Sequence, residues 1–298
     1  MAEHVSFFDA IEANKRNSIL LIAFMFLLFM GSVIALSYMF DLGYCGASLG
    51  FFALLFYTVI VYFQGDSIIL SISGAKEATR EQYPFLYNVV EGLALASQIP
   101  MPKLYVIDDP SPNAFATGRD PKHASVAVTT GLLDIMKREE LEGVIAHEIS
   151  HIANLDIRFA MIAVVFAGAI ALVGEFAWRS MRFGFGGGGG RRDRGGGGIF
   201  ILIALFFVIL APIFAQIVRL ALSREREYLA DANGAKLTRY PAGLASALDK
   251  IGKANIPTKA ANDTTASLYF SNPFPQKFGF LGSTHPPLED RIKRLRGM

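Results

Sequence analysis

The segment His147-Glu148-Ile149-Ser150-His151 contains the residues with the clearest potential for chemistry. On an α-helix, positions i and i+4 lie on one face, so both imidazole rings can reach the same metal ion. Glu148 would lie beside that ion, where its carboxylate could take a proton from a metal-bound water molecule. The alternative is a buried helix whose histidines bond to carbonyl groups, but the apolar surroundings disfavour imidazoles without a ligand. The spacing predicts a hydrolase with one zinc ion and Glu148 as general base.

A catalytic zinc ion also needs a third protein ligand and an open position for water. The stretch from Ser223 to Asp231 reads S-R-E-R-E-Y-L-A-D, and helical spacing places Arg224, Glu227 and Asp231 along one face. Glu227 could bind the metal while Asp231 accepts the second N–H of a histidine ligand. The same pattern also fits an exposed helix face with salt bridges. Spacing alone leaves both interpretations open.

The hydrophobic composition indicates that part of the chain contacts lipid. Of the 298 residues, 52% are hydrophobic, and the mean hydropathy of +0.39 exceeds that of ordinary soluble domains. Four apolar runs approach or exceed the ~20 residues of a membrane helix, at residues 19–40, 47–63, 159–177 and 199–222. A short turn joins the first two, and a glycine- and arginine-rich tract at 186–198 joins the last two. This pattern predicts two membrane hairpins, the first beginning with a retained anchor because no signal-peptide cleavage site is present.

The remaining polar sequence falls into two blocks, and neither looks large enough to form a stable domain alone. We expect them to form one α+β domain that the second hairpin interrupts. The predicted order is membrane hairpin, half domain, membrane hairpin and half domain, at residues 1–65, 66–157, 158–222 and 223–298. Periodicity predicts helices over 75–99 and 132–155, strands over 103–108 and 124–129, a helix from 223 and a final helix over 286–295.

The histidine motif, the paired hairpins, the stretch from Ser223 to Asp231 and the segment Asn113-Ala114-Phe115-Ala116-Thr117-Gly118 together resemble the HtpX-type membrane metallopeptidases of the M48 class. The resemblance covers essentially the whole chain. It implies an α-helical membrane protein with an α+β zincin-like catalytic domain. It also implies that Glu227 is the third zinc ligand and that Asp231 supports the site, which favours the first interpretation of this stretch. A role in membrane-protein quality control and stress response follows from the same resemblance.

Two further sets of site residues are predicted. Residues 113–117 look like a short edge strand and resemble the family's substrate-binding edge, so Asn113, Ala114 and Phe115 are the predicted substrate-binding residues. An extended peptide could pair with free backbone groups there, unless the segment is an ordinary strand–loop junction. The oxyanion of the transition state needs a further donor, for which His285 is the first candidate and Arg224 the second. A loop histidine that caps the terminal helix is the other interpretation of His285.

The predicted metal ligands come from both sides of the second hairpin, so residues 158–222 must leave and return to the same side of the membrane. Basic residues that flank the spans favour a cytoplasmic catalytic domain in the cell membrane of a prokaryote. They are Lys15, Arg16, Lys76, Arg80, Arg158, Arg219, Arg224 and Arg226. Five arginines near the loop of the second hairpin favour the opposite orientation, unless that hairpin does not fully cross the membrane. They are Arg179, Arg182, Arg191, Arg192 and Arg194.

The predicted zinc-binding helices both adjoin apolar runs, so the active site should lie close to the bilayer. Misfolded or partly extracted membrane proteins, or unfolded polypeptides, are the expected substrates. A net charge of +2 with scattered basic residues predicts no nucleic-acid partner.

One alternative function is that of a peptidase for prenylated C-termini, but a cavity that encloses the lipid tail would need more than four membrane spans. The other alternative is a membrane scaffold or transporter with a regulatory metal. A transport path would be marked by ionisable residues within the spans. The only charged residues within the apolar runs are Glu175 and Arg219, each near the end of its run, which disfavours transport.

Overall fold

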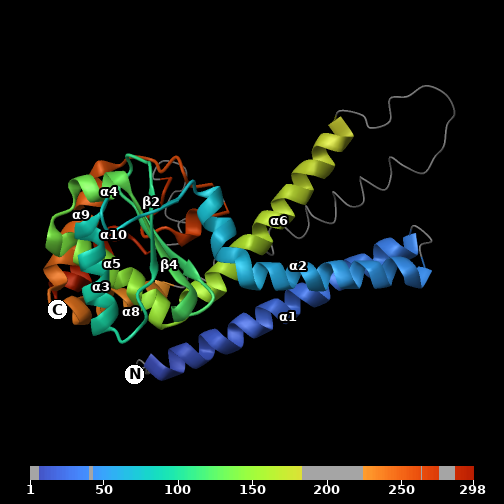
Figure 1. Ribbon diagram of the computed structural model, residues 1–298, viewed down its shortest axis with the longest axis horizontal. Helices are drawn as coiled ribbons and strands as arrows, with labels where there is room; N and C mark the ends of the chain where they lie inside the picture. Colours follow the sequence, from blue (N-terminus) through green and yellow to red (C-terminus); the bar gives the residue numbers. More distant parts are fainter. Residues whose placement is uncertain (1–6, 40–42, 183–223, 263, 275–285) are drawn as a thin grey trace.

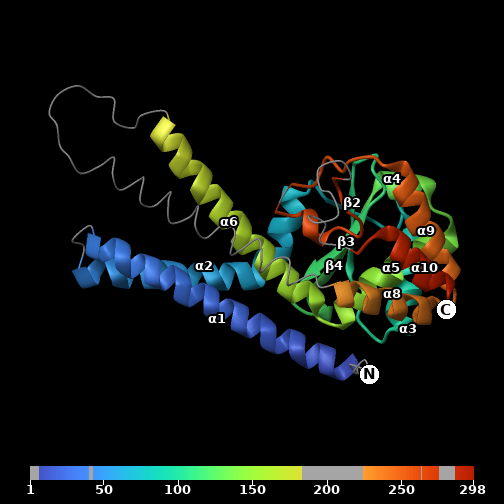
Figure 2. The ribbon, with the colours of Figure 1, turned by 180° about the vertical axis from the view of Figure 1, so that it is seen from behind.

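The computed structural model describes residues 7–39, 43–182, 224–262, 264–274 and 286–298. Three long helices extend from one side of a globular part, and the C-terminus lies on the opposite side (Figure 1, Figure 2). These helices are α1 (Phe7–Met39), α2 (Gly43–Ile72) and α6 (Asp156–Arg182). α1 and α2 contact each other, and both contact α6. The apolar helices are thereby separated from most of the polar sequence.

Within the described residues, α1 and α2 each contain a stretch that is long and apolar enough to cross a membrane. The stretches are Glu12–Gly31 and Gly43–Ile72. Large apolar side chains on them are exposed, for example Leu27 at 70%, Leu49 at 73% and Phe56 at 68%. Such a continuous apolar surface suits lipid rather than water. The first predicted hairpin is therefore present as two candidate membrane helices.

The second predicted hairpin is described only in part. α6 follows α5 (Arg138–Ala153) after a bend of 83°. By length and composition the pair fits either a broken span or a re-entrant element, although α5 itself is buried in the globular part. The predicted run at 199–222 and the tract at 186–198 lie outside the described residues. Four membrane helices in two hairpins therefore stay a prediction.

Four strands form one mixed sheet in the described part of the chain, in the order β1-β2-β4-β3. They are β1 (Lys76–Glu77), β2 (Lys103–Ile107), β3 (Ala114–Gly118) and β4 (Ala124–Thr129). β2 and β4 are parallel, whereas β1 and β3 pair antiparallel with their neighbours. The strands predicted at 103–108 and 124–129 are confirmed to within one residue, and the predicted strand near 113–117 does lie at the sheet edge.

The helix predicted over 75–99 is only partly correct. Lys76 and Glu77 pair with β2, and the helix in this region is α3 (Pro84–Ala96). Proline is accepted in the first turn of a helix, where no N–H is needed, but it disrupts a helix interior. Pro84 therefore begins the helix. The apolar periodicity of this region belongs to α3, but its upstream boundary is set by the proline and by pairing with β2.

The helix predicted over 132–155 is divided into α4 (Thr130–Ile135) and α5. Met136 between them has an extended conformation with ψ of 131°, so the first helix ends there. The Glu140 side chain then accepts the Lys137 N–H at 2.7 Å, which satisfies a donor at the start of the new helix. The motif helix thus begins at a cap that periodicity alone does not reveal.

Glu140 also joins α5 to α9 (Pro241–Ala254) through buried polar contacts. Its carboxylate accepts from Ser246 Oγ at 2.6 Å and from Lys250 Nζ at 2.6 Å. Burial alone would raise the pKa of Glu140, but Lys250, Ser246 and the Lys137 N–H outweigh burial and lower it. The resulting stabilisation is present above the ordinary carboxyl pKa and is lost as the pH falls through the lowered value.

We expect Glu140→Ala to lower the free energy of unfolding by about 2 kcal/mol, because a buried charged acceptor is removed from its donors. Glu142→Ala is the control, since Glu142 pairs with the exposed Arg138 on the same helix and such surface pairs contribute little to stability. Thermal unfolding of the detergent-solubilised protein measures both. Equal losses in the two variants would contradict the assigned role of Glu140.

The C-terminal block supplies α8 (Arg224–Thr238), α9 and α10 (Leu288–Arg296), which pack around α5 and one another (Figure 2). Side chains from both polar blocks share one hydrophobic core, as Val144, Leu244 and Leu295 illustrate. Gly143 lets α5 approach α9 closely, because a Cβ there would lie 2.8 Å from the Leu244 backbone. The final helix predicted over 286–295 is α10. This packing places the motif helix at the centre of the globular part.

Candidate metal centre

Three predicted metal ligands, two from α5 and one from α8, converge in the structure. The possible ligand atoms of His147, His151 and Glu227 all lie within 4.8 Å of one another. Glu227 Oε2 is 3.7 Å from His147 Nε2, and Glu227 Oε1 is 3.5 Å from His151 Nε2. Two imidazole nitrogens and a carboxylate oxygen are a donor set that suits a catalytic zinc ion and leaves a position open for water. The residues present therefore fit the metal that the sequence predicts.

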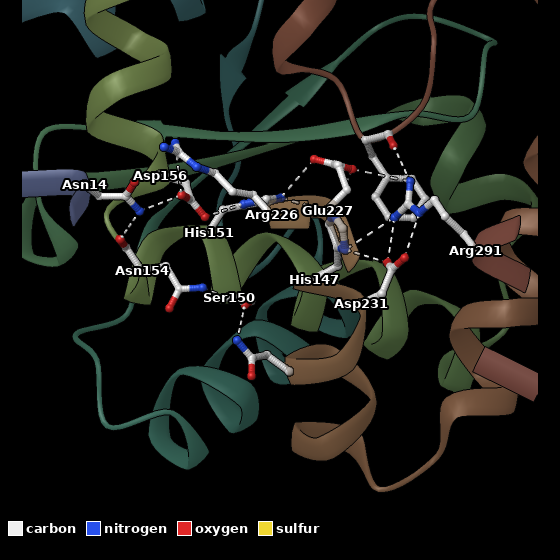
Figure 3. Close-up of polar contacts among 12 residues, drawn as sticks. Asn14, His147, Ser150, His151, Asn154, Asp156, Arg226, Glu227, Asp231 and Arg291 are labelled. Atoms are coloured by element: carbon white, nitrogen blue, oxygen red, sulfur yellow. Dashed lines mark hydrogen bonds and ion pairs between the residues drawn. The ribbon is translucent and has the colours of Figure 1, made fainter. Parts of the chain in front are cut away.

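Both histidines are oriented by carboxylates on the ring nitrogen that faces away from the centre (Figure 3). His147 Nδ1 lies 2.9 Å from Asp231 Oδ1, and His151 Nδ1 lies 3.0 Å from Asp156 Oδ2. A carboxylate at Nδ1 favours the tautomer that carries its proton there, which leaves the Nε2 lone pair for a metal. The predicted supporting role of Asp231 has a geometric basis. Asp156 was not predicted, since it lies in the bend after the motif helix.

Arg291 on α10 is a buried cation beside this centre. It is 0% exposed and binds Asp231 through two hydrogen bonds, from Nε at 2.8 Å and from Nη2 at 2.7 Å. Its Nη1 also lies 3.6 Å from Glu227 Oε2. Burial would raise the pKa of Asp231, but Arg291 outweighs burial and holds it at about 2. Sequence reasoning missed Arg291, because nothing in its spacing separates it from Lys293 and Arg294.

The charge states of the motif residues follow from burial and from these partners. Burial lowers the pKa of His147 to about 4 despite Asp231, so this imidazole is neutral, as a metal ligand must be. Burial also lowers the pKa of His151, but hydrogen bonds to Asp156 and Glu227 outweigh that effect and raise it well above its ordinary value. Burial raises the pKa of Glu148 to about 7, with the Glu227 charge adding to the increase and the His151 charge opposing it. A carboxyl group with a pKa in this range is what a general base near neutral pH requires.

A cavity of about 30 Å³ lies against these residues. Its volume exceeds the ~10–15 Å³ that a water molecule requires. Polar groups of the centre form one part of its wall and apolar side chains the other. The lining residues include His147, Glu148, His151, Glu227, Ala116, Ala160, Arg226, Leu268 and Tyr269. A reacting group in this cavity would contact Glu148 while it is shielded by apolar walls.

The edge strand β3 lies beside Glu148. The Ala116 N–H donates a hydrogen bond to the Glu148 carboxylate, and Ala116 lines the cavity. Of the three predicted substrate-binding residues, Phe115 is buried at 0% exposure and Ala114 accepts the Phe270 N–H at 2.7 Å. The position of β3 nearest the reacting groups is therefore Ala116, which sequence reasoning included in the segment but did not select.

Asn113 is used within the protein itself. Its Nδ2 donates to Thr258 Oγ1 at 3.2 Å and to Ser271 O at 3.1 Å. Its Oδ1 accepts from Ser271 N at 3.2 Å and from Ala114 N at 3.1 Å. These contacts attach the segment around residue 271 to the start of β3. In this structure the Asn113 amide holds the edge strand in place.

Of the two predicted oxyanion donors, only Arg224 lies within the described residues. His285 lies outside the described residues. Arg224 is exposed at the start of α8, whereas Glu227 and Asp231 lie on the buried face of the same helix. Arg226, which was not selected from the sequence, lines the cavity and places Nη1 3.6 Å from Asp156 Oδ1. The alternation S-R-E-R-E offered two arginines, and helix orientation decides which one faces the cavity.

Comparisons with known proteins agree with this geometry. The family model described as peptidase family M48 matches residues 80–298. A protein named protease HtpX homolog from Dictyoglomus thermophilum is 51% identical over 294 residues, which cover 98% of this chain and 95% of the relative. A protein of the same name from Thermoanaerobacter pseudethanolicus is 47% identical over 288 residues, or 96% of each chain.

A likeness to a solved structure concerns the fold alone. The crystal structure of S. mikatae Ste24p aligns with a TM-score of 0.52 at 21% sequence identity. The match covers 89% of this chain and 62% of that chain. With most of the sequence matched by the family model and nearly all of it by the relatives, the chain belongs to peptidase family M48 and is a metalloprotease of the HtpX type.

Proposed function

We propose that this protein is a zinc-dependent endopeptidase of the prokaryotic cell membrane, with His147, His151 and Glu227 as zinc ligands and Glu148 as general base. One observation carries the proposal. The three ligand atoms lie within 4.8 Å of one another, and beside them is the buried carboxylate of Glu148, which is not one of the three ligands. A zinc ion held there would act as a Lewis acid and make a water molecule more acidic.

The protein's own residues perform the proton transfers in this proposal. Glu148 takes a proton from the attacking water and returns it to the amide nitrogen that leaves. Asp231 and Asp156 keep the two imidazoles oriented, and Arg291 keeps Asp231 ionised. For the developing oxyanion we propose His285 as donor, with Arg224 as the second candidate.

Backbone pairing at β3 is the proposed mode of substrate binding. β3 pairs with β4 on one side only, and its Ala116 lies at the cavity beside Glu148. An extended peptide added along this edge near Ala116 would bring a carbonyl group toward the centre. Asn113, Ala114 and Phe115 form the start of the edge, where the Ala114 N–H and C=O already bond to Asn113 Oδ1 and to Phe270 N. Main-chain pairing reads little of a substrate's sequence, which supports a broad specificity.

We propose misfolded or damaged membrane proteins as substrates and a catalytic domain that faces the cytoplasm. α6 begins only three residues after α5 ends, so the cavity lies near the start of a long apolar helix. Its wall includes Ala160 from that helix. A site in this position favours polypeptides at the bilayer surface. The protease relatives argue against the alternative of a scaffold or transporter.

Zinc binding and proteolysis together test the proposal. We expect wild-type protein purified in detergent to bind about one zinc ion per chain and to cleave casein, and a chelator to remove both properties reversibly. We expect Glu227→Ala to weaken zinc binding by roughly 100-fold or more, because even partners of metal ligands contribute 10- to 100-fold.

Glu225→Ala is the matched control, because Glu225 is exposed on the same helix. Zinc content is measured by metal analysis after gel filtration and activity by the release of casein fragments. Wild-type protein that binds no zinc, or a Glu227→Ala variant that holds zinc as tightly as wild type, would refute the assigned ligand set.

A further inference from the structure

The Asn14 side-chain amide on α1 contacts the bend that lies beside the metal centre. Asn14 is only 3% exposed, and it lies near the start of the apolar stretch Glu12–Gly31. Its Nδ2 donates to Asn154 O at 2.8 Å and to Asp156 Oδ1 at 2.7 Å. Figure 3 shows the amide beside the bend that joins the motif helix to α6. The N-terminal candidate membrane helix is thereby in contact with residues that lie 140 and 142 positions away in the sequence.

The two acceptors belong to the bend between α5 and α6. Asn154 ends α5, where helix carbonyls have no partner within the helix, and Asp156 begins α6. Leu155 between them has a φ of 61°, a left-handed conformation that is unfavourable for leucine. Both partners of Asn14 are acceptors, so the amide must present its NH₂ group to them. Asn14 thus connects the two sides of a bend that holds Asp156 in place.

Asp156 passes this contact on to a metal ligand. Its Oδ1 accepts from Asn14 while its Oδ2 lies 3.0 Å from His151 Nδ1. Arg226 Nη1 lies 3.6 Å from Oδ1 and supplies a positive charge that does not depend on Asn14. The Asn14 amide therefore fixes the orientation of the Asp156 carboxylate and adds no charge. Removal of the amide would leave the Asp156 carboxylate beside Arg226 but less constrained in direction.

We propose that Asn14 is a positioning residue for the zinc centre, which fixes the His151 imidazole through Asp156 and so makes zinc affinity depend on the docking of the first membrane helix. This inference rests on the proposed role of His151 as a metal ligand. α1 is then part of the metal centre as well as an anchor.

The test compares the zinc dissociation constants of full-length variants in detergent, measured by competition with a metallochromic chelator. We expect Asn14→Ala to raise the dissociation constant by about three- to tenfold. The variant loses a hydrogen bond to Asp156, which is the partner of a metal ligand, but it keeps Asp156 itself, so the effect should be smaller than that of removing Asp156. Ser18→Ala is the control, because Ser18 is buried one turn along α1 and donates to the Asn14 carbonyl at 2.8 Å. We expect its change to stay below about twofold.

A second variant separates hydrogen bonding from packing. Asn14→Asp preserves the shape of the side chain but sets an oxygen against both acceptors, so we expect a larger rise in the dissociation constant than Asn14→Ala causes. A residue that only fills space would give the reverse order. The reverse order, or an Asn14→Ala variant with wild-type affinity, overturns the inference.

A double-mutant cycle tests the path through Asp156. In an Asp156→Ala background, Asn14→Ala should change the dissociation constant by less than about twofold, because the group it orients is gone. Full additivity of the two substitutions overturns the inference. Wild-type protein that binds no zinc would refute the proposed function as well, whereas normal wild-type binding with unaffected Asn14 variants refutes this inference alone.

Discussion

Glu148→Gln should lower kcat/KM for peptide cleavage by about 10²- to 10⁴-fold, the range over which positioned general bases contribute. Glutamine keeps the size of the side chain and its contact with the Ala116 N–H, but it cannot accept a proton from water. Zinc should remain bound, because the three converging ligand atoms come from other residues. Loss of proteolysis with retention of the metal would identify Glu148 as a participant in the reaction rather than a ligand.

Proteolysis of casein and zinc content should be measured on the same preparations of Glu148→Gln and wild type. Glu142→Gln is the matched control, because Glu142 lies on the same helix and pairs with an exposed arginine. We expect its activity to match that of wild type. A Glu148→Gln variant that cleaves as fast as wild type would show that another group removes the proton.

Arg291→Leu should lower the free energy of unfolding by about 3–5 kcal/mol, the usual effect of leaving a buried charge without its partner. Arg291 is fully buried and makes two hydrogen bonds to Asp231, which is itself only 3% exposed. Without the guanidinium, the pKa of Asp231 should rise, and His147 would lose an ionised acceptor at Nδ1. We therefore expect weaker zinc binding as well as a melting temperature lower by roughly 10 °C.

Arg294→Leu provides the control on the same helix, since Arg294 is exposed and its guanidinium lies 3.6 Å from the centre of the Tyr228 ring. We expect a loss of only about 1 kcal/mol there. Adding Asp231→Asn to Arg291→Leu should restore part of the stability, because it removes the unpaired charge. Equal melting temperatures for the Arg291→Leu and Arg294→Leu variants would contradict the role assigned to Arg291.

The local pattern of the chain was sufficient for the elements that depend on neighbours in sequence. The spacing of His147 and His151 on a helix, the strands at 103–107 and 124–129 and the apolar runs of α1 and α2 follow from periodicity. Glu227 and Asp231 needed more. Their spacing fitted an exposed helix face equally well, and the family resemblance decided between the two interpretations.

Boundaries were less predictable than elements. The break between α4 and α5 depends on an extended Met136 and on a cap from Glu140, whose carboxylate is in turn held by Lys250 more than a hundred positions away. The start of α3 depends on Pro84 and on pairing of β1 with β2. The ends of such helices depend both on local conformational preference and on contacts with distant parts of the chain. Apolar periodicity reflects only the local preference.

By itself the sequence determined the chemical type of this protein, because a zinc hydrolase motif is a local arrangement on one helix and lipid-facing helices are local runs of apolar residues. Only the tertiary structure decided which polar groups surround that motif. Asn14, Asp156 and Arg291 come from three separate helices, and Ala116 comes from the sheet edge. Their roles depend on burial and on distances between segments far apart in the chain, and no spacing along the sequence encodes those quantities.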